Sequence, residues 1–378
     1  METMMKDLGE IITGNTPSKK NEAFWNSGDI CFVKPDIISD NGVNEIFESN
    51  EYISERARKK ARIVSRDSIF ITCIGSIGKI GIALEGEYAF NQQINAIVPN
   101  DKVVPKYLAY NLLYNKPRLV SIANAPVVPI INKSQFGNFT INIDSDKNKQ
   151  SEIVDVLDKL THIIKQRNDE LFDLENLIKA RFVEMFGDIA TGNYKYDTRK
   201  LGDVANVGSS HRVFTTEFVK KGIPFYRGTE IGELANGNKP AEPFYISEEH
   251  YNRLVYNDTK PQVGDLLLPS ICNKGQVWMV DTDEPFYYKD GRVLCISPDR
   301  EIFDTKYLEY FMKAKTLVEY PKLGSGSTFA EFKIFLLKNI DVLIPPRELQ
   351  EQFSMFVHQV DKSKFEELKV FNLKQKIR

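Results

Sequence analysis

The feature that most constrains the fold is a run of 40 residues, 147 to 186, in which apolar side chains recur at heptad-like steps. The steps are 4, 3, 4, 7, 3, 4 and 7 residues, and Lys, Glu and Asp are frequent between them. This spacing predicts one long helix that packs along a partner helix. At 1.5 Å per residue the helix would span roughly 60 Å, which is too long for the core of one small domain. The apolar positions are Ile153, Leu157, Leu160, Ile164, Leu171, Leu174, Ile178 and Met185.

A second run, 349 to 378, repeats this pattern and offers the partner helix. At a constant offset of 200 residues, Gln150 matches Gln350 and Leu157 matches Val357. The chain therefore has the pattern of a duplication in which each copy ends in a helix. The apolar positions of the second run are Phe353, Val357, Val360, Leu368 and Phe371.

The duplication extends through the residues that precede each helix. Leu8-Gly9-Glu10 corresponds to Leu201-Gly202-Asp203, and Tyr52-Ile53-Ser54-Glu55 recurs as Tyr245-Ile246-Ser247-Glu248. The offset drifts from 193 to 200, so small insertions separate the copies, and loops tolerate such insertions at little cost. A shared framework with altered loops is therefore expected.

Within a copy the pattern predicts a mixed α+β globule. Strands are expected at 67–73, 80–84, 94–98 and 139–143, and helices at 105–114 and at 54–64, the latter with Ser54 as its N-cap. The predicted organisation is a globule at 1–145, a long helix at 146–187, a linker at 188–197, a second globule at 198–344 and a second long helix at 345–378.

Composition gives no global signature of nucleic-acid binding. The formal net charge is −2 and the pI is near 6.2, so any anion-binding surface must be local. The four cysteines form no CxxC pair and each lies in an apolar run, which favours buried free thiols in a reducing compartment. The first residues lack the apolar core of a signal peptide, and no apolar run approaches the ~20 residues that span a bilayer. We therefore expect a cytoplasmic protein that makes no membrane contact.

Motifs that carry catalysis or bind cofactors do not occur in the sequence. The four histidines are scattered and none has the spacing of a metal site. The turn Gly75-Ser76-Ile77-Gly78-Lys79 lacks the first glycine and the hydroxyl residue of a phosphate-binding loop. The segment Ile344-Pro345-Pro346 lacks the flanking residues of an amino-methyltransferase active site. The sequence therefore predicts a binding protein rather than an enzyme, with no cofactor or metal of its own.

One local basic cluster lies on the segment 52–66 of the first copy. Such a cluster is a candidate face for contacts with DNA phosphates. A solvated helix face is the alternative interpretation, because the corresponding segment of the second copy, 248–257, is not basic. The basic residues are Arg56, Arg58, Lys59, Lys60, Arg62 and Arg66.

Further candidates lie on polar loops that differ between the copies. They carry residue types that read base edges, with Arg and Lys suited to guanine and Asn and Gln suited to adenine. In any single loop these polar residues could simply stabilise a turn, so the prediction of DNA contacts rests on the whole set of loops. In the first copy the candidates are Ser18, Lys19, Lys20, Lys34, Ser76, Lys79, Asn91, Gln92 and Gln93. In the second copy they are Ser209, His211, Arg212, Arg227, Thr229, Asn273, Lys274, Gln276, Lys289 and Arg292.

Several motifs resemble the specificity subunits of type I restriction–modification systems. The stretch from Leu8 to Ser18 and the segment from Asp67 to Lys79 look like parts of a target-recognition domain of that family. The segment from Ile344 to Gln352 resembles the junction that opens the family's conserved helices. The resemblance, with recognition domain and helix each occurring twice, covers nearly all of the 378 residues.

The resemblance implies a subunit with no catalysis of its own. Each recognition domain would read one half of a bipartite double-stranded DNA target. Two long antiparallel helices would form a coiled-coil spacer that sets the gap and docks two modification subunits. Those subunits would carry S-adenosylmethionine and methylate adenine after extruding it from the stack. Two restriction subunits would add translocation and cleavage driven by ATP and magnesium.

Two alternatives from other classes remain open at this point. A DNA-modifying enzyme with a fused recognition domain would bind S-adenosylmethionine as an isolated chain. A coiled-coil scaffold that binds protein rather than DNA would show no salt-dependent duplex binding, whereas phosphate contacts weaken steeply as salt rises.

Overall fold

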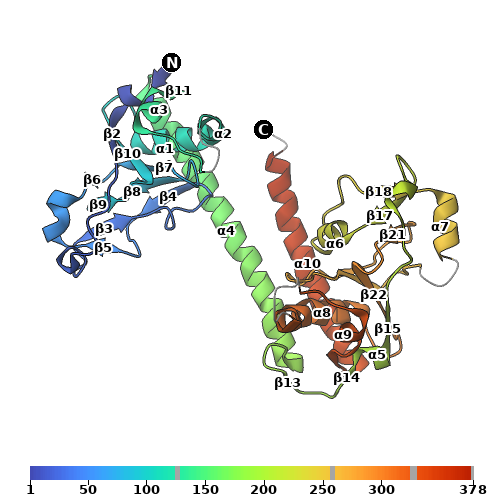
Figure 1. Cartoon of the computed structure of the whole chain (residues 1–378). Coiled ribbons are helices and arrows are strands. Elements are labelled where there is room, and N and C mark those ends of the chain that lie inside the picture. The colour runs from blue at the N-terminus through green and yellow to red at the C-terminus, as the bar shows by residue number, and fades with distance from the viewer. Residues whose placement is uncertain (124–127, 256–259, 324–329, 376–378) are drawn as a thin grey trace. The chain divides into compact units, whose positions relative to one another are not determined.

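The computed structural model describes residues 1–123, 128–255, 260–323 and 330–375 of the chain, with side chains described through residue 364. Two compact units, Met1–Gln166 and Arg167–Arg378, divide the chain within its longest helix. Figure 1 labels the helices and strands of both units. In the described ranges no helix is long and apolar enough to cross a membrane.

The first unit is built on a five-stranded sheet with both faces covered. Ile69 and Ile71 of β7 pack under the helices with Leu108, whereas Phe70 between them faces a second sheet. The strands β7 and β8 are buried along their whole length, which explains their nearly continuous apolar sequences. The sheet order is β2 (Gly9–Thr13), β10 (Ile94–Pro99), β7 (Ile69–Thr72), β8 (Ile80–Ala83) and β4 (Val43–Ile46), and the helices are α1 (Pro105–Tyr114), α2 (Lys116–Ser121) and α3 (Lys133–Asn138).

The turn between β7 and β8 is the glycine-rich segment that the sequence places between two strands. Gly75 and Gly78 have φ of +77° and +78°, a region that residues with a Cβ rarely adopt. The strands predicted at 67–73, 80–84 and 94–98 are therefore observed as β7, β8 and β10, and the predicted helix 105–114 is α1.

The second sheet of this unit contains a parallel strand pair, β3 with β9. Its order is β5 (Tyr52–Ile53), β3 (Ile30–Val33), β9 (Glu87–Phe90) and β6 (Ile63–Ser65), and the short 3-10 helices are η1 (Met5–Asp7), η2 (Glu22–Phe24) and η3 (Glu55–Lys60).

The prediction of a helix at 54–64 was wrong. Only the 3-10 helix η3 forms there, and the Ser54 hydroxyl donates to the Ala23 carbonyl instead of capping it. Ile63 and Val64 then pair with β9 as strand β6, because β-branched residues at a sheet edge gain more from strand pairing than from helix continuation.

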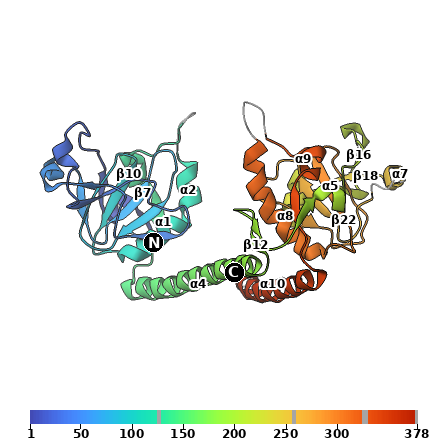
Figure 2. The same cartoon turned by 90° about the horizontal axis from the view of Figure 1, so that it is seen from below.

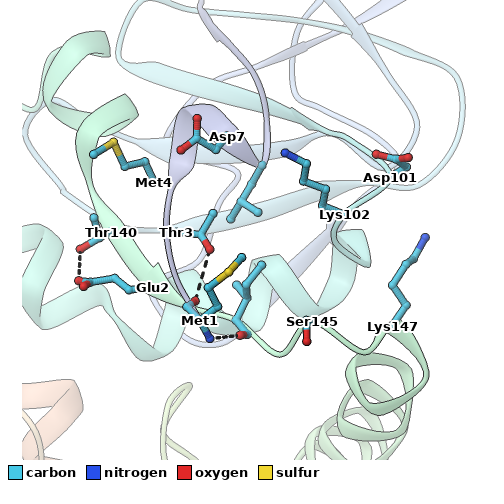
Figure 3. A pocket seen from close by; sticks show the side chains of 12 residues that line it. Met1, Glu2, Thr3, Met4, Asp7, Asp101, Lys102, Thr140, Ser145 and Lys147 are labelled. Carbon is cyan, nitrogen blue, oxygen red and sulfur yellow. Dashed lines mark hydrogen bonds between the residues drawn. The ribbon is translucent and has the colours of Figure 1, made fainter.

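The N-terminal strand β1 (Glu2–Met4) pairs with β11 (Thr140–Asn142) beside the start of the long helix. The Met1 amine donates to the Ile143 carbonyl at 2.6 Å, and the Thr140 hydroxyl donates to Glu2 at 2.7 Å. Figure 3 shows these contacts around a cavity of about 670 Å³, which Lys102 and Lys147 also line.

The second unit repeats both sheets. One has the order β15 (Ala205–Gly208), β22 (Val293–Pro298), β19 (Leu266–Pro269) and β20 (Trp278–Met279). The other has the order β16 (Phe218–Val219), β18 (Phe244–Ile246), β17 (Ile223–Tyr226) and β21 (Tyr287–Tyr288), and β17 pairs with β21 in parallel as β3 does with β9. Figure 2 shows this sheet on the side of the unit away from α10. The duplicated α+β architecture predicted from the sequence is confirmed.

Helices and a short strand pair complete the second unit. β14 (Thr198–Lys200) pairs with β23 (Asp341–Leu343), which brings the two ends of this globule together. The helices are α5 (Leu201–Val204), α6 (Gly228–Ala235), α7 (Glu248–Leu254), α8 (Thr305–Glu319) and α9 (Ile334–Lys338), with the 3-10 helices η4 (Thr215–Glu217) and η6 (Tyr320–Leu323).

The long helices are α4 (Lys147–Phe186) and α10 (Arg347–Gln375). Within the second unit, the Phe182 ring lies 5.4 Å from the Phe353 ring, and Ile178 and Val357 line one hollow. Residue 182 of α4 thus contacts residue 353 of α10, whereas the lower-numbered residue 178 lies near the higher-numbered residue 357. These ends of the two helices therefore run antiparallel. The end of α4 is part of this unit's core, since Phe182 and Phe186 are fully buried there.

The predicted seam is only partly buried. Ile178, Phe353, Val357 and Val360 are buried and Leu174 is half-buried, whereas Ile153 and Ile164 are about 40% exposed. Leu157, Leu160 and Leu171 are intermediate, and the side chains of Leu368 and Phe371 lie outside the described residues. A continuous coiled coil along the whole of α4 stays a prediction.

The segment predicted as a linker, 188–197, contains most of a β-hairpin. β12 (Gly187–Asp188) pairs with β13 (Asn193–Tyr194), and Ile189 is buried in the core of the second unit. Gly187 has φ of +97° and its missing Cβ would stand 2.2 Å from the Asn193 carbonyl oxygen, so this tight exit from α4 requires glycine.

Both long helices begin with the same buried hydrogen-bonded glutamine. The Gln150 amide accepts from the Val104 N–H at 2.7 Å and donates to the carbonyls of Asp144 and Lys102. The Gln350 amide accepts from the Asp304 N–H at 2.9 Å and donates to carbonyls of Pro345 and Ile302 at 2.8 and 3.0 Å. Each side chain is fully buried, so its unit holds the helix start in one register.

Replacing Gln350 by alanine should lower the free energy of unfolding by about 1–3 kcal/mol, because it leaves buried backbone groups unpaired. Urea unfolding of the full chain measures this loss. Gln352, which is exposed on the same helix, supplies the matched control, and Gln352→Ala should change stability by less than about 0.5 kcal/mol. Equal losses in both variants would contradict the role given to the buried amide.

Candidate nucleic-acid interface

In the first unit the candidate loops meet where the parallel strands β3 and β9 end. Val33 lies opposite Phe90, and the Asn91 N–H donates to the Val33 carbonyl at 3.1 Å. Lys34 and the run Asn91-Gln92-Gln93 therefore start side by side, because the carboxyl ends of parallel strands share one sheet edge. Asn91 itself is buried and bonds to Gln93, so Gln92, which is exposed, is the member of the run most open to a ligand.

Three other loops join this edge. The Thr16 hydroxyl donates to Gln92 at 2.8 Å, and the Lys79 ammonium donates to the Pro35 carbonyl at 3.2 Å. The Asn15 amide donates to the Lys60 carbonyl at 2.7 Å, which connects the end of η3 to the same edge. We call residues 14–20, 34–36, 58–60, 76–79 and 91–93 the first loop edge.

Several cations of the first loop edge are held by carboxylates. Lys34 lies 2.6 Å from Glu51 and Lys19 lies 2.9 Å from the same carboxylate. The hydrogen bond from Lys34 holds the pKa of Glu51 below its usual value and raises the pKa of Lys34. Lys19 also lies 4.9 Å from the centre of the Trp25 ring.

The basic cluster on η3 contains two kinds of residue. Arg58 is clamped by Glu55 and Glu87, and these hydrogen bonds raise its pKa further. Arg56, Lys59 and Lys60 instead form no ion pair within the described part of the chain, and all three are exposed. Free surface charge therefore lies on Arg56, Lys59 and Lys60 rather than on Arg58.

In the second unit the same edge is formed by β17 and β21. Tyr226 lies opposite Tyr288, and the Lys289 N–H donates to the Tyr226 carbonyl at 2.9 Å, so Arg227 and Lys289 start side by side. Ser209 donates to the Val293 carbonyl at 2.8 Å. We call residues 209–212, 227–229 and 289–292 the second loop edge, whereas Gln276 accepts the Lys274 N–H at 3.0 Å within its own turn.

Arg227 is the most constrained cation of the second loop edge. Its Nη2 donates to Glu230 Oε1 at 2.6 Å, its Nε donates to Oε2 at 3.2 Å, and its guanidinium lies 4.5 Å from the centre of the Phe244 ring. The bond from Arg227 opposes the effect of burial, and the pKa of Glu230 is lowered as a result. Arg292 is paired with Glu331 at 2.8 Å, and Lys289 with Asp290 at 3.3 Å.

The remaining predicted residues of this unit differ in placement. His211, Arg212 and Thr229 are exposed, and Arg212 lies 5.4 Å from the centre of the Phe214 ring. Lys274 lines a hollow of about 590 Å³ between the end of α4 and α8, whereas Asn273 is an exposed residue of the same turn. In the first unit Ser18, Lys20 and Ser76 are exposed as well.

The structure adds residues that were not among the predicted contacts. Glu230, Phe244 and Trp25 hold or flank cations of the loop edges. The role of Glu230 could have been found from the sequence. A glutamate three residues after the N-cap of a helix often accepts the N-cap N–H, and Glu230 accepts the Arg227 N–H at 2.8 Å.

The described residues contain neither a cluster suited to a metal ion nor a reactive thiol. Among the described residues no group of three or more His, Cys, Asp or Glu could hold a metal ion. All four cysteines are free and buried, and burial raises their thiol pKa, to about 11 for Cys31, Cys73 and Cys272 and to about 12 for Cys295. These thiols are therefore protonated at neutral pH and poor nucleophiles.

Together these features define a class of chain with two repeated α+β domains, each with a polar loop edge and each followed by a long helix. The family model for the type I restriction–modification DNA specificity domain matches residues 1–172 and 193–377. The chain belongs to this family, as the resemblance of its motifs predicted.

Named relatives agree with this assignment. The MjaIX specificity subunit of Methanocaldococcus jannaschii is 26% identical over 383 residues, covering 93% of this chain and 84% of the relative. The EcoR124I/EcoR124II specificity subunit of Escherichia coli is 29% identical over 170 residues, covering 42% of this chain and 41% of the relative.

Solved structures agree in fold. The type I specificity subunit of M. genitalium aligns with a TM-score of 0.57 at 15% identity, covering all of this chain and 93% of that one. A chain from a structure of type I complex assembly and conformational transition aligns with a TM-score of 0.54 at 15% identity, covering all of this chain and 95% of its own.

Replacing Lys59 and Lys60 together by alanine should weaken binding to every duplex alike. Each lost phosphate contact should reduce the slope of log affinity against log salt by about 1, so the pair should reduce it by about 2. Duplex binding by the full-length chain, titrated with salt, measures the slope.

Two controls separate this effect from a general loss. Arg58→Ala should leave the salt slope nearly unchanged, because two carboxylates already balance that charge, and Lys133→Ala on α3 should also leave it unchanged. An unchanged slope for the double variant would show that the η3 cluster is only a solvated face.

Proposed function

We propose that this chain is the DNA-recognition subunit of a type I restriction–modification complex, in which each unit reads one half of a bipartite target. The observation that carries the proposal is the repeated loop edge. The same parallel strand pair presents Lys34 and Gln92 in the first unit and Arg227 and Lys289 in the second. A constant framework with different reading residues suits two different half-sites.

The two kinds of contact divide between the residues of each edge. Unpaired surface cations such as Lys59 and Lys60 suit the phosphate backbone, which fixes position without conveying sequence. Amide and guanidinium groups such as those of Gln92 and Arg227 suit base edges in the major groove. A local basic surface also explains how a chain with a net charge of −2 binds a polyanion.

The long helices act as the spacer in this proposal. Their starts are fixed by Gln150 and Gln350, so the distance between half-sites follows from helix length, as dimer geometry sets half-site spacing in other DNA-binding proteins. The exposed apolar residues Ile153, Ile164 and Phe172 of α4 suit contacts with partner subunits.

The partners supply the chemistry in this proposal. Two modification subunits dock on the chain and carry S-adenosylmethionine for adenine methylation, and two restriction subunits carry ATP and magnesium. The chain itself has no catalytic role. The absence of catalytic motifs from its sequence supports this division of labour.

The test is single-molecule methylome sequencing of the host with and without this gene, in a strain whose modification subunits are expressed. Deletion should remove adenine methylation at one bipartite motif, and restoring the gene should return it. An unchanged methylome in that strain would contradict the proposal. Binding of S-adenosylmethionine by the purified chain would favour a modifying enzyme instead.

Exchanging residues 198–344 for those of a relative with a different target should change one half of the methylated motif and leave the other half intact. The cut points keep β14 paired with β23, so the exchanged globule retains its closing strand pair. Methylome sequencing of the exchanged strain gives the readout. A change in both halves would contradict the assignment of one half-site to each unit.

A further inference from the structure

We propose that Arg227 reads a guanine in the half-site taken by the second unit, through paired hydrogen bonds from Nη1 and Nη2 to the guanine O6 and N7 atoms. This inference rests on the proposed function and names one base contact within it.

The side of the guanidinium that carries Nε is already occupied. Glu230 accepts from Nη2 at 2.6 Å and from Nε at 3.2 Å, and it also accepts the Arg227 backbone N–H at 2.8 Å. The Glu230 side chain is only 6% exposed, so its position is set by the fold around it. A buried carboxylate with three bonds to one residue fixes the direction in which that residue points.

One face of the guanidinium is covered as well. The Phe244 ring lies 4.5 Å away, and behind it the Phe218 ring stacks at 4.7 Å with an interplanar angle of 14°. An arginine held by a carboxylate and placed over an aromatic ring loses little conformational entropy on binding, because its rotamer is already selected.

The edge that remains is the one formed by Nη1 and Nη2. Within the described residues Nη1 makes no hydrogen bond, and the Arg227 side chain is 44% exposed at the end of β17. Two parallel N–H groups on this edge match two adjacent acceptors. In the major groove only guanine presents such a pair on one base, whereas adenine presents one acceptor and one donor.

The corresponding position of the first unit does not have this geometry. Lys34 follows β3 as Arg227 follows β17, but its ammonium is shared between Glu51 and Asp36 at 2.6 and 3.9 Å. Arg58 has carboxylates on both edges, since Glu55 accepts from one and Glu87 from the other. Arg227 therefore combines a fixed plane with an open bidentate edge.

The first experiment compares methylomes of the host that carries the unchanged chain, Arg227→Ala or Arg227→Lys. Both variants should accept other bases at one G·C pair of a single half-site, and the other half-site should be unchanged. Arg227→Lys keeps the charge but loses the planar fork, so it separates base reading from phosphate contact. Arg199→Ala, an exposed arginine on β14 of the same unit, should leave the motif unchanged.

The second experiment uses the complex purified from that host and a duplex that carries the methylated motif. Replacing the guanine at the relaxed position by 7-deazaguanine removes N7 and should weaken binding of the unchanged complex by about 5- to 150-fold. Hypoxanthine at that position keeps O6 and N7 and should bind normally. The Arg227→Ala complex should not distinguish the three bases.

The outcomes separate this inference from the function on which it rests. A methylome without a bipartite motif overturns the proposed function. If the motif is bipartite and both variants keep full specificity at every position, the proposed function stands and only the base contact by Arg227 is overturned. A uniform loss of affinity in Arg227→Ala with a salt slope reduced by about 1 would assign Arg227 to a phosphate and overturn it too.

A folding defect is detected independently. Arg227→Ala leaves the buried Glu230 carboxylate without its partner, whereas the double variant Arg227→Met with Glu230→Gln removes both charges. If Arg227→Ala abolishes methylation, the double variant and Arg227→Lys test whether Arg227 reads the base. Relaxation at the same G·C pair in these variants supports the inference, and intact specificity overturns it.

Discussion

A single buried amide at the start of each long helix connects the helix to the rest of its unit. Apolar contacts between a helix and a globule allow sliding, whereas three directed hydrogen bonds to backbone groups allow one register. Gln150 and Gln350 make such bonds to the loops that lead into α1 and α8. Those helices cover one face of a sheet whose other face carries the second sheet and its loop edge. Within each unit, rigid contacts therefore run from the helix start to the loop edge.

Carboxylates decide which cations of the loop edges are available to a ligand. From the sequence alone, four cations of the loop edges are indistinguishable as positive charges, but in the structure each is paired with a carboxylate. They are Lys34, Arg58, Arg227 and Arg292. Pairing neutralises the long-range field of a cation and also fixes the direction of its remaining donors. Lys59 and Lys60, which lack such partners among the described residues, contribute to the field without fixed direction. The proposed function therefore assigns steering and base reading to different residues.

Much of the framework could be predicted from the sequence because it depends on local periodicity. The bounds of α4 and α1 follow from apolar spacing and from a proline at the first turn, and the duplication follows from matched motifs. The predicted helix at 54–64 failed because its outcome depends on pairing with β9, a strand more than twenty residues away in the sequence. Most of the predicted loops meet at one sheet edge in each unit, whereas the turn at 273–274 lies elsewhere, beside α8. The sequence did not indicate the carboxylate and aromatic neighbours of the loop cations. Glu51, Glu87 and Phe244 reach those cations only after the chain has folded.

The duplication also explains how two halves of one chain can diverge in what they recognise. Residue 34 follows β3, which is buried throughout, and residue 227 follows β17, in which Phe225 is buried and Tyr226 is half-buried against a second cluster. The register of each strand is set by these side chains and by its parallel partner, so the backbone there does not depend on the residue that it presents. A lysine with two acidic neighbours and an arginine with one carboxylate and one aromatic ring occupy the same position in the two units. Such substitutions change the donors offered to a ligand and leave the core untouched. Recognition can therefore vary at these positions without loss of stability, provided that the carboxylate partner changes together with the cation.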